Sequence, residues 1–138
     1  MRRDHARRRV RSRWVSGGRW RVHARVERFA EPALLLLLAE QPAHGYELLE
    51  RLPALTGGDT VEMGNLYRLL RALEEEGVVS STWDASAAGP AKRRYELTDS
   101  GRRLLDQWAD ALRKTSGRIE AFIDRYERRE EVKDAPRS

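Results

Sequence analysis

The sequence predicts a mainly α-helical fold with a small β-hairpin and one long C-terminal helix. Three observations predict this fold class. Pro and Gly residues divide the chain after residue 28 into three short segments whose apolar residues recur with helical spacing. Two segments rich in β-branched and apolar residues then flank a loop containing Gly89-Pro90, which is typical of a hairpin. The remaining segment, residues 99–130, carries a long heptad-like apolar stripe.

Length and composition fit one compact domain with an additional arm. The chain has 138 residues, of which 40% are hydrophobic, so it can bury a core unaided. It contains no Cys, which excludes a disulfide framework, a thiolate metal site and a thiol nucleophile. Its longest apolar run, residues 33–39, is far shorter than the roughly 20 residues that span a bilayer. Residues 1–28 also lack the apolar segment of a secretory signal, so we expect a cytoplasmic protein without a membrane partner.

The positive charge is concentrated at the start of the chain. The net charge is +5, but residues 1–28 contain eleven Arg and two acidic residues, a net +9. Residues 29–138 contain 16 basic and 20 acidic residues, a net −4. We therefore predict a flexible Arg-rich N-terminal arm over residues 1–28. Such arms bind nucleic acid or acidic membrane surfaces through long-range electrostatics.

The Arg-rich composition of residues 1–28 is also compatible with three different origins. Of the 27 basic residues, 24 are Arg, a bias that GC-rich coding also produces, so the arm could be a mis-assigned translation start. A transit peptide is likewise rich in Arg and poor in acidic residues. A membrane-binding amphipathic helix is less favoured, because residues 1–28 contain few large apolar side chains.

Two short helices are expected at the start of the domain, which we place at residues 29–98. Glu31-Pro32 opens the first, residues 32–40, and Gln41-Pro42 ends it. This helix is apolar nearly all round, so it should lie deep in the core. The second begins near residues 43–45 and runs to Leu52, before Pro53. The connection over residues 55–59 contains Gly57-Gly58, which suits a sharp turn.

The third helix, residues 61–76, has one apolar and one polar face. Four Leu residues stand at offsets 0, 3, 4 and 7, and Gly77 follows at the position where helices commonly end: Leu66, Leu69, Leu70 and Leu73. The opposite face has nothing in the sequence to pack against and consists of Gly64, Asn65, Tyr67, Arg68 and Arg71.

The hairpin and the last helix follow. The predicted strands are residues 78–83 and 93–97, separated by a loop over residues 85–91. Thr98 is a suitable N-cap for a helix over residues 99–130, with Asp99 favourably placed near the N-terminus. Residues 131–138 are expected to form a tail.

The stripe on the last helix predicts dimerisation. Its members are spaced alternately by three and four residues: Leu105, Trp108, Leu112, Thr115, Ile119, Phe122 and Tyr126. A helix of this length reaches about 45 Å, more than a core of roughly 70 residues can cover. The alternative is that the stripe packs onto the chain's own domain. Gly117 costs about 1 kcal/mol relative to Ala and would allow a bend.

In this order the elements describe a winged helix-turn-helix with an added dimerisation helix. The major groove of DNA admits one α-helix, and a β-hairpin can follow the adjacent backbone or minor groove. The third helix should therefore enter the groove, where Asn65, Arg68 and Arg71 can read base edges or bind phosphates. Lys92, Arg93 and Arg94 on the hairpin are the only basic cluster in residues 29–98, a stretch with a net charge of −5. We therefore expect double-stranded DNA as the partner.

An enzyme and a protein-interaction module are the two contrary classes of function. The sequence lacks the phosphate-binding loop, zinc-protease and nucleophile-elbow motifs, and its three His residues share no ligand spacing. It therefore predicts no enzyme, no catalytic residue, no metal and no cofactor, with His44 acting at a helix start. The alternative function is a winged-helix protein-interaction module that does not read DNA sequence, because residues 29–98 are acidic overall.

Four blocks of sequence carry a family resemblance. They are residues 34–40 (LLLLLAE), 44–48 (HGYEL), 64–77 (GNLYRLLRALEEEG) and 89–101 (GPAKRRYELTDSG). In this order and spacing they resemble the PadR family of bacterial transcriptional regulators over about residues 29–130. Residues 1–28 lie outside the family core.

The resemblance implies a homodimeric winged-helix repressor that binds an inverted-repeat operator and is released by a small molecule. It implies that Gly64 lets the recognition helix begin close to DNA and that Tyr46 reaches a phosphate. Tyr67 would lie on or beside the recognition surface, although it would also suit a half-buried place between helices. Asn65 stands where the family commonly has Thr or Ser, which would alter base preference.

The resemblance also implies an effector. Phenolic acids and planar drug-like compounds are effectors in this family, and Trp108 with Leu105 and Leu112 would line a pocket for one at the subunit interface. Plain packing is the alternative for Trp108, and Trp83 is expected to anchor the core or the wing. The sequence specifies neither the operator, the regulated gene nor the effector, and it does not separate a repressor from an activator.

Overall fold

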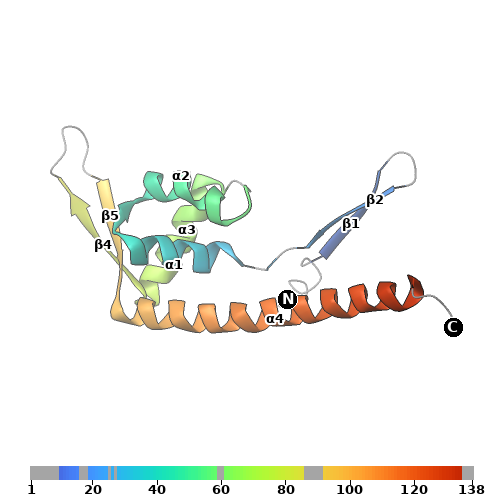
Figure 1. Ribbon diagram of the computed structural model, residues 1–138. Helices are drawn as coiled ribbons and strands as arrows, with labels where there is room; N and C mark the ends of the chain where they lie inside the picture. Colours follow the sequence, from blue (N-terminus) through green and yellow to red (C-terminus); the bar gives the residue numbers. More distant parts are fainter. Residues whose placement is uncertain are drawn as a thin grey trace.

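The winged-helix part of the chain rests on the first half of a long helix (Figure 1). The computed structural model describes residues 10–15, 19–24, 26, 28–58, 61–85 and 92–134. The elements in chain order are β1 (Val10–Val15), β2 (Arg19–Ala24), α1 (Ala30–Glu40), β3 (Ala43–His44), α2 (Gly45–Leu55), α3 (Met63–Glu75), β4 (Val79–Asp84), β5 (Lys92–Leu97) and α4 (Asp99–Asp134). The predicted fold class is confirmed, and no helix among the described residues is long and apolar enough to cross a membrane.

Helix α1 is the centre of the core, as its composition predicts. Six residues of the helix are buried, and Leu36 is the one leucine that reaches the surface: Pro32, Ala33, Leu34, Leu35, Leu37 and Leu38 are the buried ones. The helix begins at Ala30, two residues before the expected position. Pro32 falls within the first turn, where its missing N–H group costs no intrahelical hydrogen bond.

Helix α2 passes through Pro53, so the expectation that it ends at Leu52 is wrong. A proline removes one N–H group and crowds the preceding turn, but near the end of a helix few hydrogen bonds remain to be lost. The N–H of Thr56 still donates to the carbonyl of Leu52 at 3.1 Å, which completes the last turn. Gly57 and Gly58 then have φ values of 74° and 89°, which confirms the sharp turn.

Helix α3 ends as the sequence indicates. Gly77 has a φ of 79°, a conformation that glycine adopts without a steric penalty. The N–H of Val78 donates to the carbonyl of Leu73, and the N–H of Gly77 to that of Glu74, both at 3.0 Å. This is the Schellman pattern, and it turns the chain directly from α3 into β4.

The hairpin of β4 and β5 is confirmed and belongs to a three-stranded antiparallel sheet. The strand order is β3-β5-β4, with Ala43 opposite Tyr95 and Ser81 opposite Tyr95 on the other side. Strand β3 was not predicted, because two residues are too few to show a period. It places the start of α2 beside the wing.

Helix α4 is longer than the sequence indicates. It continues to Asp134, so residues 131–134, assigned to the tail, are helical, and Gly117 does not interrupt it. No proline follows Pro90 until Pro136, which explains the extension. Thr98 is the N-cap, since its Oγ1 accepts a hydrogen bond from the N–H of Gly101 at 3.1 Å.

The expected flexible arm contains an antiparallel hairpin. β1 pairs with β2 so that Trp14 lies opposite Trp20 and Val10 opposite Ala24. The signal was present in the sequence, because two segments containing Val and Trp flank Gly17-Gly18. The high Arg content predicted a flexible arm, and that prediction did not use the hairpin pattern. Residues 1–9, most of the loop over residues 85–91 and the tail residues 135–138 lie outside the described part of the chain.

Candidate nucleic-acid interface

The outer face of α3 is built by the same periodicity that buries its inner face. Leu66, Leu70 and Leu73 are at most 1% exposed and hold the helix on the core. All residues of α3 predicted to contact DNA lie away from that core: Gly64, Asn65, Tyr67, Arg68 and Arg71. The structure therefore brings together on one surface the α3 residues that the sequence singled out.

Asn65 and Arg68 interact with each other at the start of this face. Nη2 of Arg68 donates to Oδ1 of Asn65 at 2.8 Å, and its Nε donates to the carbonyl of Gly64 at 3.4 Å. These contacts orient the guanidinium group along the first turn of α3. The side-chain amide of Asn65 keeps its NH₂ group available for another acceptor.

The wing presents its basic cluster to solvent. Lys92, Arg93 and Arg94 are exposed. The guanidinium carbon of Arg93 lies 4.6 Å from the centroid of the Trp83 ring, a cation–π arrangement. Trp83 is 63% exposed, so of the two expected roles the structure gives it the one on the wing and not the one in the core.

A hydrogen-bonded chain ties the wing to the end of α3. Nη1 of Arg93 donates to the hydroxyl of Ser81 at 2.8 Å, and that hydroxyl donates to the carboxylate of Glu74 at 2.7 Å. The sequence assigned no role to Ser81 or Glu74, because neither lies on the predicted contact face and their contacts join different elements. The link sets the position of the wing cation relative to the recognition helix.

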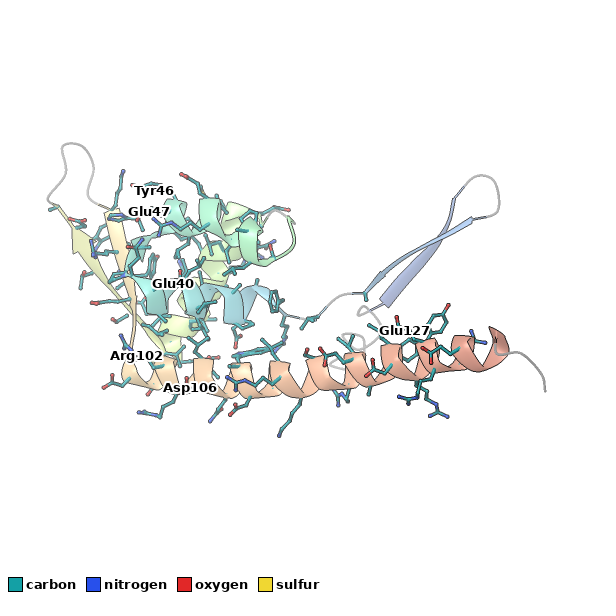
Figure 2. The ribbon with its side chains drawn as sticks, in the orientation of Figure 1. Glu40, Tyr46, Glu47, Arg102, Asp106 and Glu127 are labelled. Atoms are coloured by element: carbon teal, nitrogen blue, oxygen red, sulfur yellow. The ribbon has the colours of Figure 1, made fainter. Side chains whose placement is uncertain are left out.

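The first turn of α2 is organised around its N-cap, His44. Figure 2 shows Tyr46 and Glu47 of this turn at the end of α2 that faces the wing strands. The N–H of His44 donates to Oε1 of Glu47 at 2.8 Å, and its two ring nitrogens lie 3.1 Å from carboxylate oxygens of Glu47 and Asp84. The hydrogen bond from the His44 backbone holds the pKa of Glu47 below its usual value. The expected helix-start role of His44 is therefore confirmed.

Tyr46 follows on the exposed side of α2. Its ring stacks on His44 with centroids 5.7 Å apart, and Nζ of Lys92 lies 4.7 Å from the Tyr46 ring centroid. Tyr46 is 41% exposed, which leaves its ring at the surface shared by α2 and the wing. A basic group and a phenol are thus held side by side at this edge.

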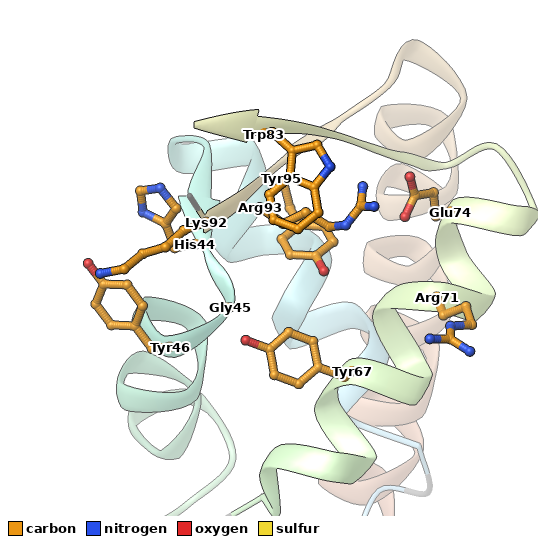
Figure 3. Close-up of a pocket in the computed structure, with 10 residues that line it drawn as sticks. All are labelled: His44, Gly45, Tyr46, Tyr67, Arg71, Glu74, Trp83, Lys92, Arg93 and Tyr95. Atoms are coloured by element: carbon orange, nitrogen blue, oxygen red, sulfur yellow. The ribbon is translucent and has the colours of Figure 1, made fainter. Parts of the chain in front are cut away.

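A cleft of about 620 Å³ separates α3 from the wing and the start of α2 (Figure 3). Aromatic and basic side chains make up most of its lining, together with Gly45, His44 and Glu74: Tyr46, Tyr67, Trp83, Tyr95, Arg71, Lys92 and Arg93. Predicted interface residues from three elements therefore meet at one depression. Gly45 and Tyr95 also line it, although the sequence assigned neither of them a role at the interface.

The apolar stripe on α4 is divided between two environments. Leu105 and Trp108 pack against the core, and the indole N–H of Trp108 donates to Glu31 at 2.8 Å. Leu112 and Thr115 are half-buried. Ile119, Phe122 and Tyr126, 47–72% exposed, are uncovered in the single chain, together with Ile123, which lies outside the heptad spacing and was not predicted. The alternative of internal packing thus applies to the first two members of the stripe.

The fold and this face define a winged helix-turn-helix regulator: a recognition helix, a basic wing and a long helix that projects from the domain. The sequence profile of the PadR-like transcriptional regulator family matches residues 34–107, more than half of the chain. The chain belongs to the PadR family of transcriptional regulators.

Individual relatives agree with this assignment. The chain is 37% identical over 95 residues to a probable transcriptional regulator of Mycobacterium tuberculosis, a match that covers 67% of this chain and 50% of the relative. It is 38% identical, with a TM-score of 0.64, to the crystal structure of a conserved protein described as a potential transcriptional factor, covering 72% of this chain and 88% of that one. PadR of Bacillus subtilis, solved in complex with operator DNA, is 26% identical with a TM-score of 0.54, covering 59% of this chain and 47% of that one. The chain spans about half the length of that PadR and of the mycobacterial relative.

Proposed function

We propose that this PadR-family regulator is a homodimeric repressor that binds an inverted-repeat operator through α3 and the wing. The observation that carries the proposal is the shared surface: Tyr67 and Arg71 of α3 line one cleft with Lys92 and Arg93 of the wing, and the other candidates on these two elements are exposed. The Bacillus subtilis relative was solved with operator DNA, which supports double-stranded DNA as the partner.

The division of labour between the two elements follows from groove dimensions. The major groove, about 12 Å wide, admits α3, and base edges are then within reach of Asn65 and Arg68. The exposed cations of the wing face the neighbouring phosphates, which fix position and affinity but not sequence. Gly64 has no Cβ at the first turn of α3, so the helix can approach the DNA closely.

Dimerisation is supported by the uncovered half of α4. Phe122 is 72% exposed, more than any other large apolar side chain among the described residues, and Ile119, Ile123 and Tyr126 lie within two turns of it. A second copy of the helix would bury these residues and place two recognition helices on one face. Successive major grooves on one side of DNA are about 34–36 Å apart, which matches a two-fold symmetric operator.

Release by a small aromatic effector is part of the proposal, with Trp108 near the subunit interface. In the single chain Trp108 already packs on the core and donates to Glu31. If Trp108 binds the effector, addition of the effector should quench Trp108 fluorescence and also weaken DNA binding. A Trp108→Phe variant that responds to the same compound with an unchanged loss of DNA affinity would remove this part of the proposal.

The test of DNA reading compares the full chain with a Lys92→Ala, Arg93→Ala, Arg94→Ala triple variant on its own upstream DNA and on a scrambled duplex across a salt series. Each phosphate contact contributes about 0.9 to the slope of log affinity against log salt. We expect the triple variant to lose up to about three such contacts. If the wild-type protein binds neither duplex, the protein-interaction module is the better interpretation, as the acidic charge of residues 29–98 would favour.

A further inference from the structure

The cleft between α3 and the wing contains a phenol whose ring is buried and whose hydroxyl is reached from the cleft, since no buried polar side-chain atom among the described residues lacks a partner. Tyr95, on β5, is 5% exposed, and the described part of the chain gives its hydroxyl no hydrogen bond. Figure 3 shows its ring between Trp83 and Tyr67. A hydroxyl that opens into a cleft and has no protein partner can donate to a ligand or water that enters there.

A second phenol of the cleft, Tyr67, packs closely against Gly45, which has no side chain in the way. A Cβ on Gly45 would lie 2.7 Å from Cζ of Tyr67, which is closer than real Cβ contacts come. The ring of Tyr67 therefore occupies the space that any residue other than glycine would fill. Gly45 does not have a positive φ, so the glycine is required by this contact and not by its own backbone.

The charges around the two phenols favour an anion. Burial raises the pKa of Tyr95, and the charges that act on it come from Arg93, Arg71, Glu74 and the neighbouring Tyr67. The hydroxyl of Tyr95 is therefore a donor at neutral pH. Glu74 is the acidic group in the lining, and its carboxylate accepts a hydrogen bond from Ser81. Arg93 uses one N–H group on Ser81 and has others to offer.

We propose that this cleft binds one phosphate of the DNA strand that passes from the major groove to the adjacent minor groove. The hydroxyls of Tyr67 and Tyr95 donate to the phosphate, and the guanidinium groups at the rim supply the counter-charge. When α3 lies in the major groove and the wing lies over the neighbouring groove, the sugar-phosphate backbone between them runs across this cleft. Gly45 is a positioning residue, since it admits the ring of Tyr67. The inference rests on the DNA-binding function proposed above.

The experiment measures affinity of the full chain for its upstream DNA and for a scrambled duplex, with Tyr95→Phe as the main variant. That change removes one hydroxyl and keeps the ring, so the fold is retained and thermal unfolding verifies it. We expect both affinities to fall about tenfold, or about 1.4 kcal/mol, because a phosphate contact carries no sequence information. Ser116→Ala, which removes an exposed hydroxyl on α4, is the matched control and should change neither affinity.

Replacement of single phosphates by neutral methylphosphonates identifies the contact. Wild-type affinity should fall at one phosphate in each half-site, and Tyr95→Phe should be insensitive at that same phosphate. If wild type binds DNA and Tyr95→Phe binds equally well, the inference fails while the proposed function stands. If wild type binds no duplex, the proposed function itself fails. Titration with inorganic phosphate tests whether the cleft binds free phosphate and not a phosphate of DNA. Phosphate binding that depends on Tyr95, together with no effect of any methylphosphonate on DNA affinity, would overturn the assignment to DNA.

A Gly45→Ala variant tests the positioning role. It should lower affinity for both duplexes about as much as Tyr67→Ala does. Adding Tyr67→Ala to Gly45→Ala should then cause little further loss, because the two residues act through the same ring. Fully additive losses would contradict the role of Gly45.

Discussion

Replacing Gly101 with Ala would disturb the joint between α4 and the wing sheet. Gly101 is buried in the first turn of α4, against the backbone of Val78 just before β4 and the side chain of Leu97 at the end of β5. An added Cβ would overlap the carbonyl oxygen of Val78 and lie 2.6 Å from Cδ1 of Leu97. The first of these neighbours is backbone and cannot rotate away, so the helix itself has to move.

The expected cost follows from two opposing terms. Overpacking of this kind typically costs about 1–3 kcal/mol, and a clash with backbone belongs at the upper end of that range. Ala is favoured over Gly in a helix by about 1 kcal/mol, which offsets part of the cost. The net loss in free energy of unfolding is therefore about 2 kcal/mol. In a chain of this size that lowers Tm by roughly 7–9 °C.

Gly117 on the same helix provides the matched control. A Cβ at Gly117 would have no atom within 4 Å, and the residue is exposed within a continuous helix. Gly117→Ala should therefore stabilise the protein by up to about 1 kcal/mol. Urea and thermal unfolding followed by circular dichroism, at one fixed protein concentration, measure both variants. Equal and stabilising effects of the two substitutions would refute the packing argument.

Three further predictions concern pH, the core and the oligomeric state. The pKa of Glu47 is lower in the folded chain than its usual 4.5, chiefly because its carboxylate accepts the hydrogen bond from the His44 backbone. The stabilisation that Glu47 contributes is therefore present above pH 4.5 and is lost as the pH falls through the folded pKa. Glu47→Gln should flatten the decline of the urea midpoint below pH 4.5, and a decline as steep as in wild type would contradict this. Leu70 is 0% exposed, so Leu70→Ala should lower the free energy of unfolding in urea by about 2–5 kcal/mol. A loss below about 1 kcal/mol would show that Leu70 does not hold α3 on the core. Phe122→Asp should convert the proposed dimer to a monomer in sedimentation velocity and leave a folded circular dichroism spectrum, and a sedimentation coefficient equal to that of wild type would place the interface elsewhere.

The course of the helices was largely predictable from local patterns. Proline boundaries and apolar composition identified α1. Apolar spacing identified the inner face of α3 and the long α4, because helical periodicity does not require knowledge of the partners. Turn chemistry was equally local: Gly57, Gly77 and Thr98 each adopt the expected conformation or cap. The features that the sequence did not predict, the end of α2 and strand β3, had weak or conflicting local signals. Pro53 lies close enough to a helix end to be tolerated, and two residues are too few to reveal β3.

The candidate interface was predicted in its members but not in its geometry. The sequence singled out Tyr67, Arg71 and Arg93 by residue type and by the exposed side of an amphipathic pattern. It contained no sign that Gly45 is covered by the ring of Tyr67, or that Tyr95 lines the same cleft. Those contacts join segments more than 20 residues apart, so no local period records them.

The sequence by itself determined the class of fold, the faces of its helices and the residue types available for binding DNA, because short-range periodicity and turn preferences depend on neighbours in the chain. The tertiary structure alone decided which part of the α4 stripe is used internally and which is left uncovered, since that depends on how far α1 reaches along the helix. It also decided that three phenols and two guanidinium groups share one cleft. Such contacts depend on how the sheet packs against α3, which only the folded chain establishes.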